Sequence, residues 1–197
     1  MAKGKLRKNA VASGQIRIIG GLWRGRKLPV LNSEGLRPTT DRIKETLFNW
    51  LMFDINQCHC LDLFAGSGSL GFEALSRGAS QVIMVEKDHQ VAQQLSQNLA
   101  RLPQAPATVV NIDAVRYLAS PATPFDLVLL DPPFHRELLP QVCQLLEEKG
   151  WLSADAKIYI EREQAAEPLL LPPNWHLLKD KQAGQVTYQL YQREYKQ

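Results

Sequence analysis

The feature that most constrains this chain is a regular alternation of short apolar runs with amphipathic segments between Cys58 and Glu161. Short apolar runs bounded by turn signals are typical of buried strands, and apolar residues three or four apart are typical of helices. Strands that alternate with helices form a parallel sheet with right-handed crossovers. We therefore expect an α/β fold with a doubly wound, mostly parallel sheet.

The expected sheet has seven strands, because two further strand-like runs follow the alternating region. A short glycine-containing link, Lys181–Gln185, joins these two runs and is compatible with a hairpin. The end of the chain should therefore add an antiparallel edge strand. We expect strands at 58–64, 81–86, 107–112, 125–131, 157–161, 174–180 and 185–191, and helices at 67–77, 88–102, 114–118 and 138–146.

A smaller unit precedes this α/β domain, which we assign to residues 55–197. Within residues 14–54 we expect a β-hairpin about Gly20-Gly21, because paired glycines supply the positive φ angles of a primed turn. A helix with its N-cap among residues 39–41 should follow. This extension is too small for a core of its own and should pack on the domain, whereas residues 1–13 should form a disordered basic tail.

Charge is distributed unevenly along the chain. Residues 1–33 contain eight basic side chains and no acidic one, whereas the remainder carries 15 basic and 20 acidic side chains. A basic arm on an acidic body suggests a polyanionic partner such as RNA, although a solvated tail that aids solubility has the same composition. Trp23 could pack in the core or contact RNA. We assign phosphate contacts to Arg17, Arg24, Arg26 and Lys27, with Lys3, Lys5, Arg7 and Lys8, and we place Arg37 and Arg42 near the ligand crevice.

Several classes of protein are disfavoured by the 197-residue sequence. No segment approaches about 18 uninterrupted apolar residues, and the basic N-terminus leads into no apolar signal region. Three cysteines do not suggest a disulfide framework, and Cys58-His59-Cys60 lacks a second pair of metal ligands. We expect a monomeric cytoplasmic protein without a metal and without a membrane segment.

A glycine-rich loop, Asp62–Gly71, lies between the first strand of the domain and its first helix. Gly66 and Gly68 belong to a G-x-G-x-x-G pattern, and Glu86 follows at the end of the second strand. Taken alone, this pattern indicates a dinucleotide site, with the helix N-terminus facing an anion and the acidic residue accepting hydrogen bonds from ribose hydroxyls.

Asp62 favours a different cofactor. Its carboxylate would face the pyrophosphate of a dinucleotide and repel it, whereas S-adenosylmethionine carries a sulfonium and an ammonium group that attract it. At the end of the third strand, Asp113 could accept a hydrogen bond from an adenine amino group while the Ala114 amide donates to a ring nitrogen. Asp113 could equally be an ordinary helix N-cap.

The fourth strand ends in Asp131-Pro132-Pro133-Phe134. The two prolines force an extended turn, so the Asp131 side chain and the Pro132 carbonyl can present hydrogen-bond acceptors to the crevice. Phe134 adds an aromatic face on which a planar base can stack. Acceptors that orient an exocyclic amine toward an electrophilic methyl group would assist its methylation. A proline-rich strand exit with Phe134 in the core is the simpler alternative.

Three segments carry a resemblance to known families. Asp62–Gly71 resembles the cofactor loop of class I methyltransferases, and Asp131–Phe134 resembles the D/N-P-P-Y/F motif of exocyclic amino methyltransferases. The segments Gly20–Arg26 and Arg37–Glu45 are similar to the RsmD family of 16S ribosomal RNA (guanine-N2)-methyltransferases. The resemblance covers nearly the whole chain.

The RsmD resemblance implies transfer of a methyl group from S-adenosylmethionine to the N2 amine of one guanine in 16S ribosomal RNA. It also implies that the substrate is the assembled or assembling 30S subunit. Two alternatives stay open: an enzyme that methylates adenine in DNA or a glutamine side chain, and a non-catalytic RNA-binding module. The first class favours Asn where this chain has Asp131, and the second has no need of the complete set of motifs.

Overall fold

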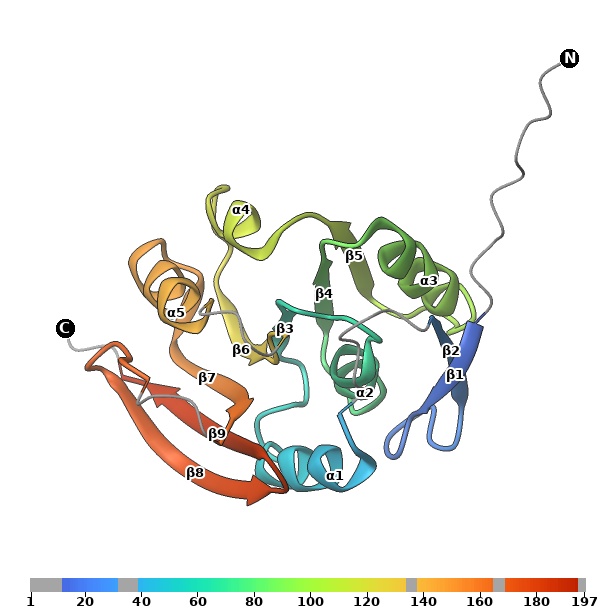
Figure 1. The fold of residues 1–197 in the computed structure, drawn as a ribbon, viewed down its shortest axis with the longest axis horizontal. Coiled ribbons are helices and arrows are strands. Elements are labelled where there is room, and N and C mark those ends of the chain that lie inside the picture. The colour runs from blue at the N-terminus through green and yellow to red at the C-terminus, as the bar shows by residue number, and fades with distance from the viewer. Residues whose placement is uncertain (1–11, 32–38, 134–137, 165–168, 195–197) are drawn as a thin grey trace, which may run out of the picture.

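A computed structural model describes residues 12–31, 39–133, 138–164 and 169–194. Its main sheet has seven strands in the order β5-β4-β3-β6-β7-β9-β8, the first five parallel and the last two antiparallel (Figure 1). The predicted doubly wound, mostly parallel fold is confirmed. The strands are β3 (His59–Asp62), β4 (Gln81–Glu86), β5 (Ala107–Asn111), β6 (Phe125–Leu130), β7 (Leu152–Glu163), β8 (Trp175–Ala183) and β9 (Val186–Arg193).

Helices cover both faces of the sheet and create two hydrophobic cores. Successive strand residues point to opposite faces, so Cys60 belongs to the first core and Leu61 to the second. Trp151 and Trp175 are buried in the second core, as expected for packing residues. The first core lies under α1 (Asp41–Trp50), α2 (Ser69–Ser76) and α3 (His89–Leu99), and the second under α4 (Ala114–Leu118) and α5 (Leu139–Glu148).

The C-terminal hairpin differs in detail from the expectation. Strands β8 and β9 run up to a tight link at Gly184-Gln185, where Gly184 has a φ of 61°. The link is therefore shorter than the predicted Lys181–Gln185. Strand β7 is longer than predicted because it pairs with β6 on one side and with β9 along the other.

The N-terminal extension forms a separate two-stranded sheet from β1 (Ala12–Arg17) and β2 (Lys27–Leu31). Strand β1 begins inside the segment assigned to the disordered tail, and residues 1–11 lie outside the described residues. The predicted turn at Gly20-Gly21 is wrong, because the connection between the strands spans residues 18–26.

The glycine pair serves to dock the extension onto the domain. Gly21 has a φ of 74°, and a side chain on it would collide with the backbone carbonyl of Ser76 at the end of α2. That carbonyl accepts a 2.7 Å hydrogen bond from the Leu22 amide, and the Ser76 hydroxyl accepts one of 2.9 Å from the Trp23 amide. Only a chain without a side chain at position 21 can approach α2 this closely.

Buried polar groups fix the rest of the extension. The Glu73 carboxylate of α2, fully buried, accepts a 2.9 Å hydrogen bond from the Ile19 amide. The buried Lys44 ammonium of α1 donates 2.6 Å to the Arg17 carbonyl. Trp23 is 6% exposed and belongs to the first core, so of its two predicted roles the structure supports packing.

Candidate active site

The predicted site residues gather where the parallel strands end. Asp62 is the last residue of β3, and Asp131 follows the last residue of the adjacent strand β6. Ligands of open α/β sheets bind outside this edge of the sheet. Asp62 is 1% exposed, and its Oδ2 accepts a 3.0 Å hydrogen bond from the Gly71 amide.

The three glycines of the loop are required for different reasons: positive φ at two positions and close packing at the third. Gly66 and Gly68 have φ angles of 50° and 77°, which favour glycine. A side chain on Gly68 would also collide with Phe72. Gly71 allows close approach instead, since its Cβ would lie 3.0 Å from Asp62 Oδ2. The loop therefore needs glycine at these three places for backbone and packing reasons.

Glu86 ends β4 and holds the glycine loop. Its Oε2 accepts a 3.0 Å hydrogen bond from the Gly66 amide, and its Oε1 accepts one of 2.8 Å from the Asp88 amide. Asp88 in turn caps α3 through the amides of Gln90 and Val91. The carboxylate is half-buried at the predicted place, and it also has a role in the loop that the sequence did not indicate.

Asp131 has a partner from the N-terminal extension. The Thr39 hydroxyl donates a 3.2 Å hydrogen bond to Asp131 Oδ2, and Thr39 is only 8% exposed. The next residue, Thr40, caps α1 by accepting from the Ile43 amide. Because the helix cap is Thr40 and not Thr39, the Thr39 side chain is available to Asp131. Sequence reasoning treated Thr39 only as a candidate cap.

The carboxylates of this edge affect one another. Burial raises the pKa of Asp62 to about 7, and the nearby charge of Glu86 adds to the effect. Burial likewise raises the pKa of Asp131 well above its ordinary value, reinforced by the charges of Glu161 and Asp62 and opposed by the Thr39 hydrogen bond. The site therefore favours ligands that bring positive charge or hydrogen-bond donors.

Glu161 is a second residue that the sequence analysis missed. It is 5% exposed near the end of β7, and its Oε2 accepts a 2.9 Å hydrogen bond from the Tyr159 hydroxyl. Burial and the charges of Glu161 and Asp131 raise the pKa of Tyr159 well above its ordinary value. The available signal was a carboxylate ending the apolar run 157–161, beside a strand that also ends in a carboxylate.

Asp113 caps α4 in the structure. Its Oδ1 accepts hydrogen bonds of 2.9 Å from the Val115 amide and 3.3 Å from the Arg116 amide, which is the alternative the sequence left open. Ala114 is buried behind it. Contact of Asp113 and Ala114 with adenine stays a prediction.

The proline turn is described only in part. Pro132 is buried and Pro133 is half-buried directly after Asp131. Phe134 and Arg37 lie outside the described residues, so their roles stay predictions.

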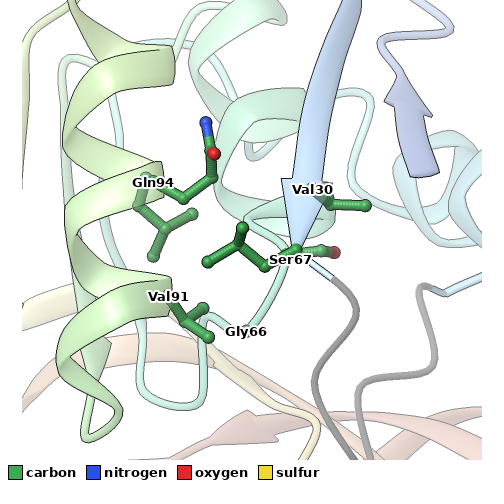
Figure 2. Close-up of a pocket in the computed structure, with 7 residues that line it drawn as sticks. Val30, Gly66, Ser67, Val91 and Gln94 are labelled. Carbon is green, nitrogen blue, oxygen red and sulfur yellow. The ribbon is translucent and has the colours of Figure 1, made fainter. Parts of the chain in front are cut away.

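The extension also reaches the glycine loop. Figure 2 shows Val30 of β2 beside Gly66 and Ser67, with Val91 and Gln94 of α3 across a small pocket. Strand β2 ends one residue after Val30, and the described chain resumes at Thr39 beside Asp131. The two described ends of the extension therefore flank the candidate site, one at the glycine loop and one at Asp131.

The basic residues assigned to RNA fall into two places. Arg17 and Arg42 are exposed near the start of α1, where Arg17 pairs with Asp41 at 2.9 Å. Arg24, Arg26 and Lys27 are also exposed but lie near the C-terminal ends of α2 and α3. These helices run back across the sheet, so this second group lies at the edge where the parallel strands begin. The structure does not bring it to Asp131.

The described residues contain neither a candidate membrane-spanning helix nor a candidate metal site. No described helix is long and apolar enough to cross a membrane. No group of three or more His, Cys, Asp or Glu side chains in the same residues could hold a metal ion. Cys58, Cys60 and Cys143 are buried, while His59 is exposed.

Comparisons with known proteins agree with this geometry. The family described as "Conserved hypothetical protein 95" matches residues 16–192. "Ribosomal RNA small subunit methyltransferase D" of Escherichia coli K12 is 56% identical over 94% of each chain, and the protein of the same name from Haemophilus influenzae is 57% identical over 92% of this chain and 95% of that one. A solved structure, "Putative methyltransferase yhhF from Escherichia coli", superposes with a TM-score of 0.87 at 53% identity, covering 93% of this chain and all of the other. The chain therefore belongs to this family, the RsmD family of class I methyltransferases.

Proposed function

We propose that the protein transfers a methyl group from S-adenosylmethionine to the exocyclic N2 amine of a specific guanine in 16S ribosomal RNA. The substrate is the assembled or assembling 30S subunit. The observation that carries the proposal is the placement of Asp131, with its proline turn, beside the buried Asp62 that opens the glycine loop. Relatives named as small-subunit ribosomal RNA methyltransferases support it.

The donor set fits S-adenosylmethionine better than a dinucleotide. Asp62 and Glu86 are carboxylates at the glycine loop, and a buried carboxylate with a raised pKa is stabilised by a cation and destabilised by a pyrophosphate. When bound, the cofactor supplies an electrophilic methyl group on a sulfonium. Asp62, Gly66, Gly68 and Glu86 would hold it, with Asp113 and Ala114 at its adenine.

Asp131 orients the acceptor amine. Its carboxylate and the Pro132 carbonyl accept hydrogen bonds from the two N–H groups of the amine, and Phe134 stacks on the base. The amine nitrogen that forms the new N–C bond must lose a proton, and the raised pKa of Asp131 suits its carboxylate to accept that proton. Thr39 holds the carboxylate in place through the hydrogen bond that its hydroxyl donates to Oδ2.

The basic residues of the extension contact RNA phosphates. This role applies to Arg17, Arg24, Arg26 and Lys27, with Lys3, Lys5, Arg7 and Lys8 of the preceding tail, while Arg37 and Arg42 bind the RNA near the ligand crevice. The extension 14–54 also covers the cofactor. The protein acts as a monomer in the cytoplasm, where bacterial ribosomes assemble, and light scattering of the purified chain tests the monomeric state.

The decisive experiment is methyl transfer to defined RNA acceptors. Purified protein is incubated with methyl-labelled S-adenosylmethionine and 30S subunits from cells that lack this protein, and the digested nucleosides are identified by mass. Label in N2-methylguanosine from 16S RNA is the expected result. Protein-free 16S RNA is the comparison that tests the requirement for the subunit. Label in adenine or in protein, or no transfer at all, would overturn the proposal.

A further inference from the structure

Two segments far apart in the sequence share the absence of acidic residues. Residues 12–31 contain no Asp or Glu, and neither do residues 89–112, which comprise α3 and β5. In the fold these segments are neighbours, with β1 and β2 lying beside α3 at one side of the molecule (Figure 1). We call this combined surface the acid-free flank.

Direct contacts hold the two segments together. The buried Asn98 of α3 donates a 2.8 Å hydrogen bond from Nδ2 to the Pro29 carbonyl of β2. Arg26 donates from Nη1 to the Arg101 carbonyl at 3.0 Å. This second bond brings two exposed arginines, Arg26 and Arg101, to the C-terminal end of α3.

Helix α3 connects these arginines with the ligand edge of the sheet, where β3, β4 and β6 end. Its 11 residues correspond to about 16 Å. The helix begins after Glu86 at the ligand edge and ends near Arg101 at the opposite edge. None of its exposed side chains is an Asp, Glu, Lys or Arg; they are His89, Gln90, Gln93, Ser96 and Gln97.

We propose that the acid-free flank binds the phosphate backbone of the RNA substrate. The backbone would lie along α3, between the ligand edge of the sheet and Arg26 and Arg101. The inference rests on the proposed function. Arginines attract phosphates through charge, and glutamine amides donate hydrogen bonds to phosphate oxygens. A carboxylate on this surface would repel the backbone, which explains why both segments exclude Asp and Glu.

Arg101 is the first residue to test, because the sequence asymmetry of residues 1–33 did not include it. Arg101→Ala should reduce the slope of log affinity for a 16S RNA fragment against log salt by about 0.7–0.9, the value of one lost phosphate contact. Cofactor affinity should not change. Arg116→Ala, which removes an exposed arginine from α4, is the matched control and should leave the slope unaltered.

The exposed glutamines of α3 give an independent test, because substituting them removes no positive charge. Gln93→Glu with Gln97→Glu adds two carboxylates to exposed positions of α3 and should weaken RNA binding. Gln141→Glu makes the same change at an exposed position of α5, outside the flank, and should have no effect. Equal binding by the α3 double variant, the α5 variant and the unchanged protein would overturn the proposal.

The two proposals can fail separately. If the unchanged protein methylates 16S RNA but the Arg101 and glutamine variants bind RNA with the same affinity and salt slope, the flank is refuted and the function stands. If these variants lose RNA affinity as expected but no methyl group reaches RNA, the flank stands and the proposed function is refuted. Thermal unfolding of each variant confirms that the fold is intact.

Discussion

The ligand edge of the sheet and the acid-free flank differ in their acidic residues, which cluster at the edge and are absent from the segments that form the flank. At the edge, burial and the charges of Glu161 and Asp62 raise the pKa of Asp131, and burial and the charge of Glu86 raise the pKa of Asp62. On the flank, two separate segments avoid carboxylates altogether. The difference indicates that this chain separates its two binding tasks: a cation and an amine on the acidic edge, and a polyanion on the flank.

The strongest way to test the edge is to remove its central carboxylate. Asp131→Ala should lower the rate of methyl transfer by at least about 100-fold, because the amine loses the acceptor that orients it. Cofactor affinity, measured by calorimetry, should stay near that of the unchanged protein. Asp155→Ala, an exposed site elsewhere on the sheet, is the control. An equally large loss of cofactor affinity would move Asp131 into the cofactor pocket.

Glu86 tests the cofactor side of the same edge. Glu86→Ala should weaken cofactor affinity by about 1–3 kcal/mol, since it leaves hydrogen-bond partners of the cofactor and of the Gly66 amide unsatisfied. Glu86→Gln retains an acceptor for the loop and separates charge from loop geometry. Unchanged affinity in the alanine variant would show that the ribose is held by another residue.

The flank should respond to salt where the edge does not. Arg24→Ala combined with Arg26→Ala should reduce the salt slope of RNA binding by up to about 1.4–1.8, twice the value of one phosphate contact. The variant should bind the cofactor normally, because these residues lie at the opposite edge of the sheet. An unaltered slope would mean that the basic extension has no part in RNA binding.

Thr39 connects the extension to the edge, and its effect should be smaller. Thr39→Val removes one hydrogen bond to Asp131 and should reduce kcat by about 2- to 12-fold, the equivalent of about 0.5–1.5 kcal/mol. A positioning role predicts unchanged cofactor affinity and recovery in Thr39→Ser. An unchanged kcat in Thr39→Val, or a loss in Thr39→Ser as large as that in Thr39→Val, would contradict the role of the hydroxyl.

The smallest expected effect is a proton released on cofactor binding. Asp62 has a pKa of about 7 in the folded protein, above its ordinary value of 3.8, so a cationic ligand should displace its proton. Affinity should rise with pH up to about 7, and calorimetry in buffers of different ionisation heat should detect the proton. Asp62→Asn should abolish the release while retaining an acceptor for the Gly71 amide.

The same raised pKa has a consequence for stability. Between pH 3.8 and about 7 the folded state keeps a proton that the unfolded chain has lost, so Asp62 lowers stability as pH rises through this window. Asp62→Asn should therefore unfold at a temperature that depends less on pH. A steeper dependence in the variant would contradict the assignment.

The sequence predicted those features that depend on local patterns. Periodicity identified the strands and helices, and the structure places Asp62, Glu86 and Asp131 of the predicted motifs at the ends of neighbouring parallel strands. The prediction for Gly20-Gly21 was wrong because paired glycines suit a turn, whereas here Gly21 lies against the Ser76 backbone at the end of α2 and Gly20 lies against the Arg77 side chain. The Thr39–Asp131 contact joins residues 92 positions apart, and no local pattern reports such a distance.

The contacts of the extension with the domain can form only late in synthesis of the chain. Translation produces β1, β2 and α1 first, but their partners Glu73, Ser76 and Asn98 come later in the chain. The apolar side of the extension must therefore wait, uncovered, until the ribosome has made about half of the protein. Asp131 comes later still. The hydrogen bond between Thr39 and Asp131 can therefore form only after β6 has been synthesised, when about two thirds of the chain exists.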